Sequence, residues 1–209
     1  WDKESGNPMC SIFSSDGQFK SFYLSKLEKL KINEDIYAKT GRVPDSSYSA
    51  FKWGYLVQNA ATIKDSLDKG TLSLGTVDSW ITYNLTGRKA YVTDYTHAAS
   101  TLLFNIKALD WDEFLVNEFQ LSLECLPQVS RSMSMFGVTD GFISLPDGIP
   151  ILAIATTNSV ELLGLGGYKF GDGYLNFDTT GHFMLNTGQE LSDFGDGKNR
   201  VILPGFKEI

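Results

Sequence analysis

The chain has 209 residues, of which 42% are hydrophobic and 21% charged, so its composition is that of a globular protein and excludes disorder for most of its length. Its 18 basic and 25 acidic residues give a net charge of −7, which repels phosphate backbones, so nucleic acid is not expected as a partner. Polar residues interrupt the most apolar segment, 149–167, so no membrane span is expected.

Cysteine and histidine are too few and too widely spaced to predict a metal site. Cys10 and Cys125 have apolar neighbours and are interpreted as ordinary core thiols. The opening residues do not resemble a signal peptide, which makes the cytoplasm the expected location.

The first expected elements along the chain are short. Residues 1–8 combine charges with a Gly-Asn-Pro sequence and predict a turn, and the apolar residues 9–13 predict a short strand. Apolar positions recur at a loose helical spacing from Phe19 to Ile36 and predict one helix. Ser49 is expected to cap a further helix, whose apolar stripe includes Trp53.

The segment 71–87 carries the clearest helix signals. Thr76 is expected to cap the helix with its hydroxyl, and Asp78 suits the positive end of the helix dipole. Gly87 is suited to the left-handed conformation that often follows a helix. Asp94, in a Thr-Asp pair, is interpreted as a loop cap.

A further helix and a strand are predicted after this segment. Asp110 is expected to cap a helix over 111–119. The unbroken apolar run Ile151–Ala155 predicts a buried strand covered on both faces, followed by a polar turn and a helix over Asn158–Gly164. Strand, turn and helix in this order are typical of an α/β sheet.

The composition becomes rich in glycine after residue 162. Gly166 and Gly167 are a candidate hinge. Apolar segments over 175–177 and 183–185 flank a Thr-Thr-Gly sequence, which predicts a hairpin. The polar tail 193–199 carries no signal for regular structure.

Several consecutive blocks resemble glycerol kinase, a member of the FGGY carbohydrate kinases, in order and spacing over residues 1 to about 190; they are WDKESGNP, LSLGTVDSWITYNLTG, YVTDYTHAASTLLFNIKALDWD, LPQV, GIPILAIA and TGHFMLNTG. The resemblance implies an α/β kinase of the actin/hexokinase-like (ribonuclease H-like) fold. It implies a polyol in the cleft between two lobes, and ATP with Mg²⁺ held mainly by the second lobe.

The resemblance also divides the chain. Residues 1–166 match the latter part of the N-terminal, substrate-side domain without its first strands, and 167–209 match the start of the C-terminal, nucleotide-side domain. The family's phosphate loop and its glycerol-gripping Arg-Glu pair are expected before the block that begins at Trp1, and its adenine-binding segment is expected beyond the matched region.

The position of the catalytic base departs from the family. Glycerol kinases carry an Asp in a Gly-Asp-Gln-Gln turn after the central strand, and this position is Thr157, with Asn158 beside it at a substrate-binding position. A threonine hydroxyl has no useful basicity near neutral pH, and losing a general base costs about 10²- to 10⁴-fold in rate. The resemblance therefore implies a weakened or absent catalytic step.

The substrate pocket departs as well. The family's aromatic wall against glycerol falls on Ser14, and the tyrosine that binds a glycerol hydroxyl falls on Ser47, although a one-residue adjustment would let Tyr48 substitute. Phe183 matches the family's pocket phenylalanine. Asp16, near the family's cleft, is the alternative candidate for a base.

The phosphate turn is partly retained. Thr180 and Gly181 match the end of the Gly-Thr-Gly turn that approaches the nucleotide phosphates, whereas Thr179 replaces its first glycine and adds a Cβ where the backbone approaches closely. His182 is more readily explained as a hairpin side chain satisfied by backbone or solvent than as a catalytic group.

Two functions remain open. One is an ATP-dependent polyol kinase with an altered acceptor. The other is a catalytically impaired glycerol kinase-like protein with a binding or structural role, whose partner is another protein or a second copy. The substitutions fall in three separate functional blocks while the scaffold blocks between them persist, which favours the second function.

Overall fold

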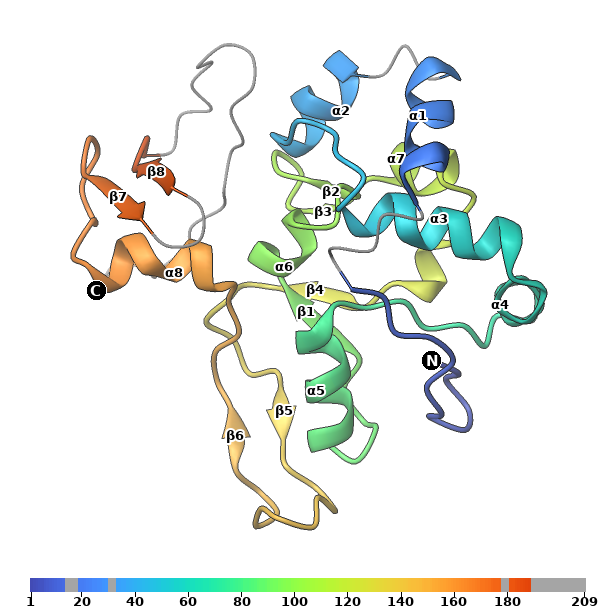
Figure 1. The fold of residues 1–209 in the computed structure, drawn as a ribbon. Helices are drawn as coiled ribbons and strands as arrows, with labels where there is room; N and C mark the ends of the chain where they lie inside the picture. The colour runs from blue at the N-terminus through green and yellow to red at the C-terminus, as the bar shows by residue number, and fades with distance from the viewer. Residues whose placement is uncertain (14–18, 30–32, 178–180, 189–209) are drawn as a thin grey trace.

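The computed structural model of the protein describes residues 1–13, 19–29, 33–177 and 181–188. Helices gather around one core in the N-terminal part of the chain, and an extended arm and a C-terminal helix with a hairpin follow (Figure 1). Each sheet within these residues has two strands. No helix in the described part of the chain is long and apolar enough to cross a membrane.

The N-terminal helices are α1 (Lys20–Lys29), α2 (Asn33–Thr40), α3 (Ser49–Asn59) and α4 (Ala61–Asp68). The single helix predicted over 19–36 is wrong, since this stretch belongs to two helices. The cap prediction at Ser49 is also wrong. Ser49 already has helical backbone, and Tyr48 takes the cap position without a side-chain hydrogen bond.

The main core surrounds α3 and includes buried residues of α2, α4 and α7 (Glu113–Glu118) and of the loops between them. Phe51 and Phe119 are fully buried, and their rings meet edge to face with centroids 5.0 Å apart. Gly54 permits this approach, because an added Cβ would lie 3.1 Å from the Phe119 ring. Trp53 is buried in the same core, as its helical spacing predicts.

A parallel strand pair connects this core to the next helices. It consists of β1 (Val92–Asp94) and β4 (Gln128–Ser130), with Asp94 opposite Ser130. Helix α5 (Val77–Leu85) precedes β1, and α6 (Tyr95–Ala99) follows it directly. The chain turn between β1 and α6 therefore sits at the carboxyl end of a parallel strand, where ligand sites in α/β proteins are commonly built.

The predicted ends of α5 are confirmed in part. Thr76 is the cap residue and Gly87 has a φ of 59°, as expected, and Asp78 lies in the first turn. The Thr76 hydroxyl, however, makes no capping bond to the backbone and instead donates to the Asp78 carboxylate. Asp78 therefore takes part in side-chain chemistry beyond the helix start.

The cap of α7 lies two residues later than predicted. Asp110 and Trp111 form β3, which pairs antiparallel with β2 (Phe104–Asn105) and so cannot begin a helix. Asp112 caps α7 instead, accepting a 3.1 Å hydrogen bond from the Leu115 amide. A 3₁₀ turn, η2 (Leu123–Cys125), then leads to β4.

The buried strand predicted over Ile151–Ala155 is wrong. Only Pro150–Ile151 form a strand, β6, which pairs antiparallel with β5 (Gly137–Val138). Leu152 is 59% exposed, because no other strand among the described residues covers this run. The helix predicted next is confirmed as α8 (Thr157–Gly164).

The C-terminal hairpin is confirmed as β7 (Gly173–Phe177) paired antiparallel with β8 (Gly181–Leu185). One face carries large exposed apolar side chains, namely Leu175, Phe177, Phe183 and Leu185, while the alternate residues are half-buried.

Two predictions near the N-terminus need correction. Residues 9–13 form no strand, and Asp2 instead bridges to Leu72. Cys125 is buried as predicted, but Cys10 is exposed and is no core thiol.

Candidate functional site

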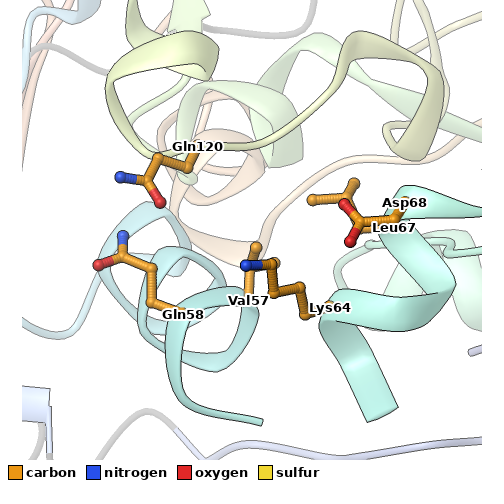
Figure 2. A pocket seen from close by; sticks show the side chains of 6 residues that line it. All are labelled: Val57, Gln58, Lys64, Leu67, Asp68 and Gln120. Atoms are coloured by element: carbon orange, nitrogen blue, oxygen red, sulfur yellow. The ribbon is translucent and has the colours of Figure 1, made fainter. Parts of the chain in front are cut away.

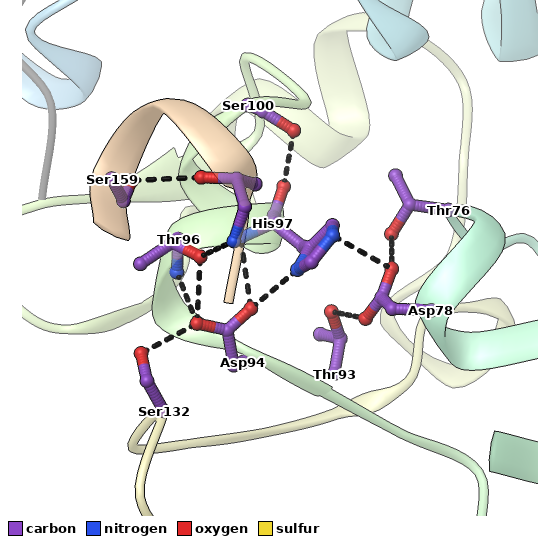
Figure 3. Close-up of polar contacts among 10 residues, drawn as sticks. Thr76, Asp78, Thr93, Asp94, Thr96, His97, Ser100, Ser132 and Ser159 are labelled. Carbon is purple, nitrogen blue, oxygen red and sulfur yellow. Dashed lines mark hydrogen bonds and ion pairs between the residues drawn. The ribbon is translucent and has the colours of Figure 1, made fainter. Parts of the chain in front are cut away.

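The turn that carries the family's base position opens α8. Thr156 is the cap residue, and Thr157 is the exposed first residue of the helix. The Thr156 amide donates a 2.8 Å hydrogen bond to the Thr96 hydroxyl, and the Thr156 hydroxyl donates at 2.7 Å to Ser159 (Figure 3). The turn is thus fixed to α6 by a side chain that lies 60 residues earlier in the chain.

Asp94 is the centre of the polar cluster below this turn (Figure 3). Its fully buried carboxylate accepts hydrogen bonds on Oδ2 from the Thr96 amide at 2.9 Å, the Thr96 hydroxyl at 2.7 Å and the Ser132 hydroxyl at 2.6 Å. Its Oδ1 accepts from the His97 amide at 3.1 Å and lies 2.6 Å from His97 Nδ1. The predicted capping role of Asp94 is confirmed, because these amides open α6.

His97 lies between two carboxylates. Its Nδ1 faces Asp94, and its Nε2 lies 3.8 Å from Asp78 Oδ1. Asp78 in turn accepts hydrogen bonds from the hydroxyl of Thr76 and, at 2.7 Å, from that of Thr93. The cluster therefore joins the starts of α5, α6 and α8 with the segment after β4.

The contacts in the cluster favour the charged forms of the Asp94 carboxylate and the His97 imidazole. Burial alone would raise the pKa of Asp94, but hydrogen bonds from His97, Ser132 and Thr96 outweigh it and hold that pKa below its usual value. Burial alone would lower the pKa of His97, but the hydrogen bond to Asp94 and the charges of Asp78 and Asp94 raise it.

Asp78, Asp94 and His97 place ligand-type atoms within 4.8 Å of one another, close enough for a metal ion. All four carboxylate oxygens already accept hydrogen bonds from protein groups or contact the imidazole. A metal would have to displace these donors, so the arrangement fits a hydrogen-bonded cluster better than a metal centre.

The predicted site residues Thr157, Asn158 and Phe183 lie on two elements that contact each other, α8 and β8. Thr157 and Asn158 are exposed on the first turn of α8, and Phe183 on β8 is 63% exposed. Helix and hairpin are joined by His182 Nε2, which lies 3.3 Å from Glu161 Oε2. The expected backbone or solvent partner of His182 is therefore replaced by a carboxylate.

Ser47 lies in the loop before α3, a helix that packs mainly on α4 and α1. It is exposed, and its amide donates to Asp45 Oδ1 at 2.8 Å. Its neighbour Tyr48 is half-buried against the main core and hydrogen-bonds the guanidinium of Arg42, whose pKa burial lowers. Tyr48 is thus already engaged in packing.

The remaining predicted residues are Gly181 and four residues that the structure does not describe. Gly181 is the first residue of β8. Ser14, Asp16, Thr179 and Thr180 lie outside the described residues.

Sequence reasoning missed the roles of His97, Thr96 and Ser132. The signal that could have found them is the run Thr-Asp-Tyr-Thr-His directly after an apolar residue at position 92, since polar side chains that follow a parallel strand gather at the edge of the sheet.

A surface hollow lies away from this cluster, between α3, α4 and the segment after α7 (Figure 2). It measures about 430 Å³ and is lined by Val57, Gln58, Lys64, Leu67, Asp68 and Gln120. None of the predicted site residues in the described part of the chain lines it, so it does not correspond to the expected polyol pocket.

The family model described as FGGY family of carbohydrate kinases, N-terminal domain, matches residues 1–164. The chain belongs to the FGGY family. Glycerol kinase 1 of Thermotoga maritima is 36% identical over 191 residues, covering 91% of this chain and 38% of that relative. Glycerol kinase of Natranaerobius thermophilus is 35% identical over 190 residues with the same coverage.

The chain is also similar in structure to solved carbohydrate kinases. Plasmodium falciparum glycerol kinase with ADP superposes with a TM-score of 0.86 at 29% identity, over 91% of this chain and 38% of that one. Xylulose kinase from Rhodospirillum rubrum, 19% identical, shares the fold with a TM-score of 0.77 over 88% of this chain and 37% of that one. The predicted fold class is confirmed, as the chain carries part of the actin/hexokinase-like kinase fold of FGGY proteins.

The chain spans 38% of the length of the first curated relatives it matches, so it represents a part of the FGGY architecture. The family match ends at residue 164, at the end of α8, while the match to the Thermotoga maritima relative covers 191 residues.

Proposed function

We propose that this chain is a glycerol kinase-like FGGY segment with impaired catalysis that serves a binding or structural role. The observation that carries the proposal is Thr157, which stands exposed at the start of α8 where the family's base is expected. Phosphoryl transfer to a hydroxyl relies on positioning, charge stabilisation and a carboxylate that orients the acceptor.

The nearby carboxylates are poor replacements for the base. Asp94 is connected to the turn through Thr96, but it is fully buried and accepts protein hydrogen bonds on both oxygens. Glu161 lies one helical turn beyond Thr157 and contacts His182. Neither is free to accept a proton from an acceptor hydroxyl at Thr157.

ATP and Mg²⁺ are implied by the family. The clustered carboxylates Asp78 and Asp94 already accept hydrogen bonds from hydroxyl, amide and imidazole groups, so a magnesium ion would have to compete with these donors. Thr180 and Gly181 are proposed to lie at the phosphate turn, with the boundary between the two domains at 166/167. We derive no step through the nucleotide or the metal.

The proposed acceptor pocket has lost two of its contacts. Ser14 supplies no aromatic wall, and Ser47 supplies no phenol. A pocket built to pair substrate hydroxyls loses most of its discrimination when the partners are removed. Weak glycerol binding supports a role that does not depend on turnover.

The hairpin exposes four large apolar side chains on one face, Leu175, Phe177, Phe183 and Leu185, in a chain that spans 38% of the length of its first curated relatives, so this face meets either the rest of the family architecture or a partner. Contiguous exposed apolar surface typically marks contact with another protein surface. The partner in this proposal is another protein or a second copy of the chain.

The alternative is an active polyol kinase with a different acceptor. It is favoured by the anchored turn at Thr156, which keeps residue 157 in a defined place, as a catalytic site requires.

The test is ATP-dependent ADP formation by the purified chain with glycerol and with a panel of other polyols and sugars. We expect no turnover above the enzyme-free rate for the wild type. Restoring the carboxylate with Thr157→Asp is also expected to give none, because a base alone recovers at most about 10²- to 10⁴-fold and the acceptor remains poorly held.

Thr157→Asn is the matched control, because asparagine has nearly the shape of the restored aspartate without its charge. Wild-type turnover that saturates with an acceptor and disappears in Thr157→Ala would overturn the proposal in favour of the alternative. Saturable glycerol turnover in Thr157→Asp, but not in Thr157→Asn, would show that the pocket is intact.

A further inference from the structure

The imidazole of His97 occupies an unusual position, between carboxylates from two different elements. Asp94 comes from the end of β1 and Asp78 from the first turn of α5. The imidazole is 20% exposed, whereas the Asp94 and Asp78 side chains are 0% and 6% exposed. A positive charge between two negative charges is favoured by their attraction, which acts against the cost of burying the charge.

Among the residues that the structure describes, these two carboxylates are the charged groups that act on His97. Two further strands pack on α6. These are β2 (Phe104–Asn105) and β4 (Gln128–Ser130), and neither carries an ionisable side chain. Glu161 on α8 lies against His182. Asp78 and Asp94 are therefore the groups that govern the charge of His97, and together they raise its pKa against the effect of burial.

A continuous chain of hydrogen bonds runs from His97 to the start of α8. His97 Nδ1 contacts Asp94 Oδ1, and Asp94 Oδ2 accepts from the Thr96 hydroxyl. That hydroxyl has a single proton, which it donates to Asp94, so its lone pair is directed to the amide of Thr156. The charge on Asp94 thereby fixes the direction of the Thr96 hydroxyl.

We propose that His97 is a positioning residue for the turn at 156–157: as an imidazolium it holds Asp94 and Asp78, and through Asp94 and Thr96 it holds the amide of Thr156. This role is independent of the proposed function, because it concerns the order of the turn and not the chemistry at Thr157.

The sign of the pH dependence follows from the geometry. The folded protein binds the His97 proton more tightly than the unfolded chain does, so protonation stabilises the fold. This contribution is fully present below about pH 6.5, which is the usual pKa of an unperturbed histidine. It is lost as the pH rises through the raised pKa of His97 in the folded state.

The experiment is an NMR titration of the purified chain combined with amide hydrogen exchange. The chain has two histidines, so His182→Asn assigns the imidazole signals and serves as the matched control, since His182 also faces a carboxylate. We expect His97 to titrate above the ordinary histidine value. We expect Thr156 amide protection, corrected for intrinsic exchange, to fall about tenfold as His97 deprotonates.

His97→Asn keeps an N–H donor toward Asp94 without the charge. It is expected to remove the pH dependence of Thr156 protection, while His182→Asn preserves it. A His97 signal that titrates at or below about pH 6.5, or Thr156 protection that does not change with pH in the wild type, would overturn the proposal. Both wild-type measurements stand even if a His97 variant fails to fold, and neither reads out activity.

Discussion

Phenylalanine side chains have opposite environments in the helical core and in the C-terminal hairpin. Phe51 and Phe119 are 0% exposed between α3 and α7, whereas Phe177 and Phe183 on the hairpin are 80% and 63% exposed. The residue type and the periodicity indicate an apolar face in both places. The difference shows that a pattern predicts which side of an element is apolar, while burial depends on whether a second layer covers that side.

The largest expected effect lies in the helical core. Phe119→Ala removes a ring that meets Phe51 edge to face at 5.0 Å and should lower the free energy of unfolding by about 3–5 kcal/mol, through lost burial and a residual cavity. Urea denaturation followed by circular dichroism measures it. A loss below about 1 kcal/mol would mean that this core is not the main source of stability.

An intermediate effect is expected at the cap of α7. Asp112 accepts two 2.9 Å bonds from Lys39 Nζ, one from Asn105 and one from the Leu115 amide. Asp112→Ala removes the cap and its charge and should lower the free energy of unfolding by about 1–2 kcal/mol. Asp112→Asn keeps a capping oxygen and should lower it less.

The Asp112 carboxylate also makes the stability of the fold depend on pH in the acidic range. Burial would raise the pKa of Asp112, but hydrogen bonds from Lys39 and Asn105 outweigh it and lower the pKa. Its contribution to stability is therefore present above about pH 3.9 and is lost as the pH falls through the lowered value. Urea denaturation measures this dependence. The difference in free energy of unfolding between wild type and Asp112→Asn should be larger at pH 7 than at pH 3.

The smallest effect is expected on the hairpin. Phe177→Ser should change the free energy of unfolding by less than about 0.5 kcal/mol, because the ring is already in water. A loss comparable to that of Phe119→Ala would show that the apolar hairpin face is covered in solution. Sedimentation velocity of the wild type and the variant would then reveal whether the cover is a second copy.

Local signals in the sequence predicted much of the fold. The start of α5 at Thr76, the left-handed Gly87, the cap at Asp94, helix α8 and the hairpin all depend on residues within a few positions of one another. Such signals succeed because their hydrogen bonds are local.

Predictions that depended on distant partners were less successful. The run Ile151–Ala155 has the composition of a buried strand, but burial requires neighbouring strands that its own sequence does not specify. Asp110 and Asp112 are equally good caps by residue type, and pairing of Asp110 with Asn105 decides between them.

The candidate site shows the same limit. The departures proposed at Thr157, Ser14 and Ser47 rest on the sequence blocks alone. The bond between Thr96 and Thr156 spans 60 positions, and that between Asp94 and Ser132 spans 38, so only the folded chain reveals the cluster around His97.

The two cysteines differ in a way that makes the protein easy to modify at one place. Burial raises the pKa of the Cys125 thiol to about 11, and its Sγ lies 2.8 Å from the Ser122 carbonyl, so very little reactive thiolate forms there near neutral pH. Cys10 is exposed. A maleimide fluorophore added at neutral pH therefore reaches a single position near the N-terminus, and the native chain accepts one defined label without mutagenesis.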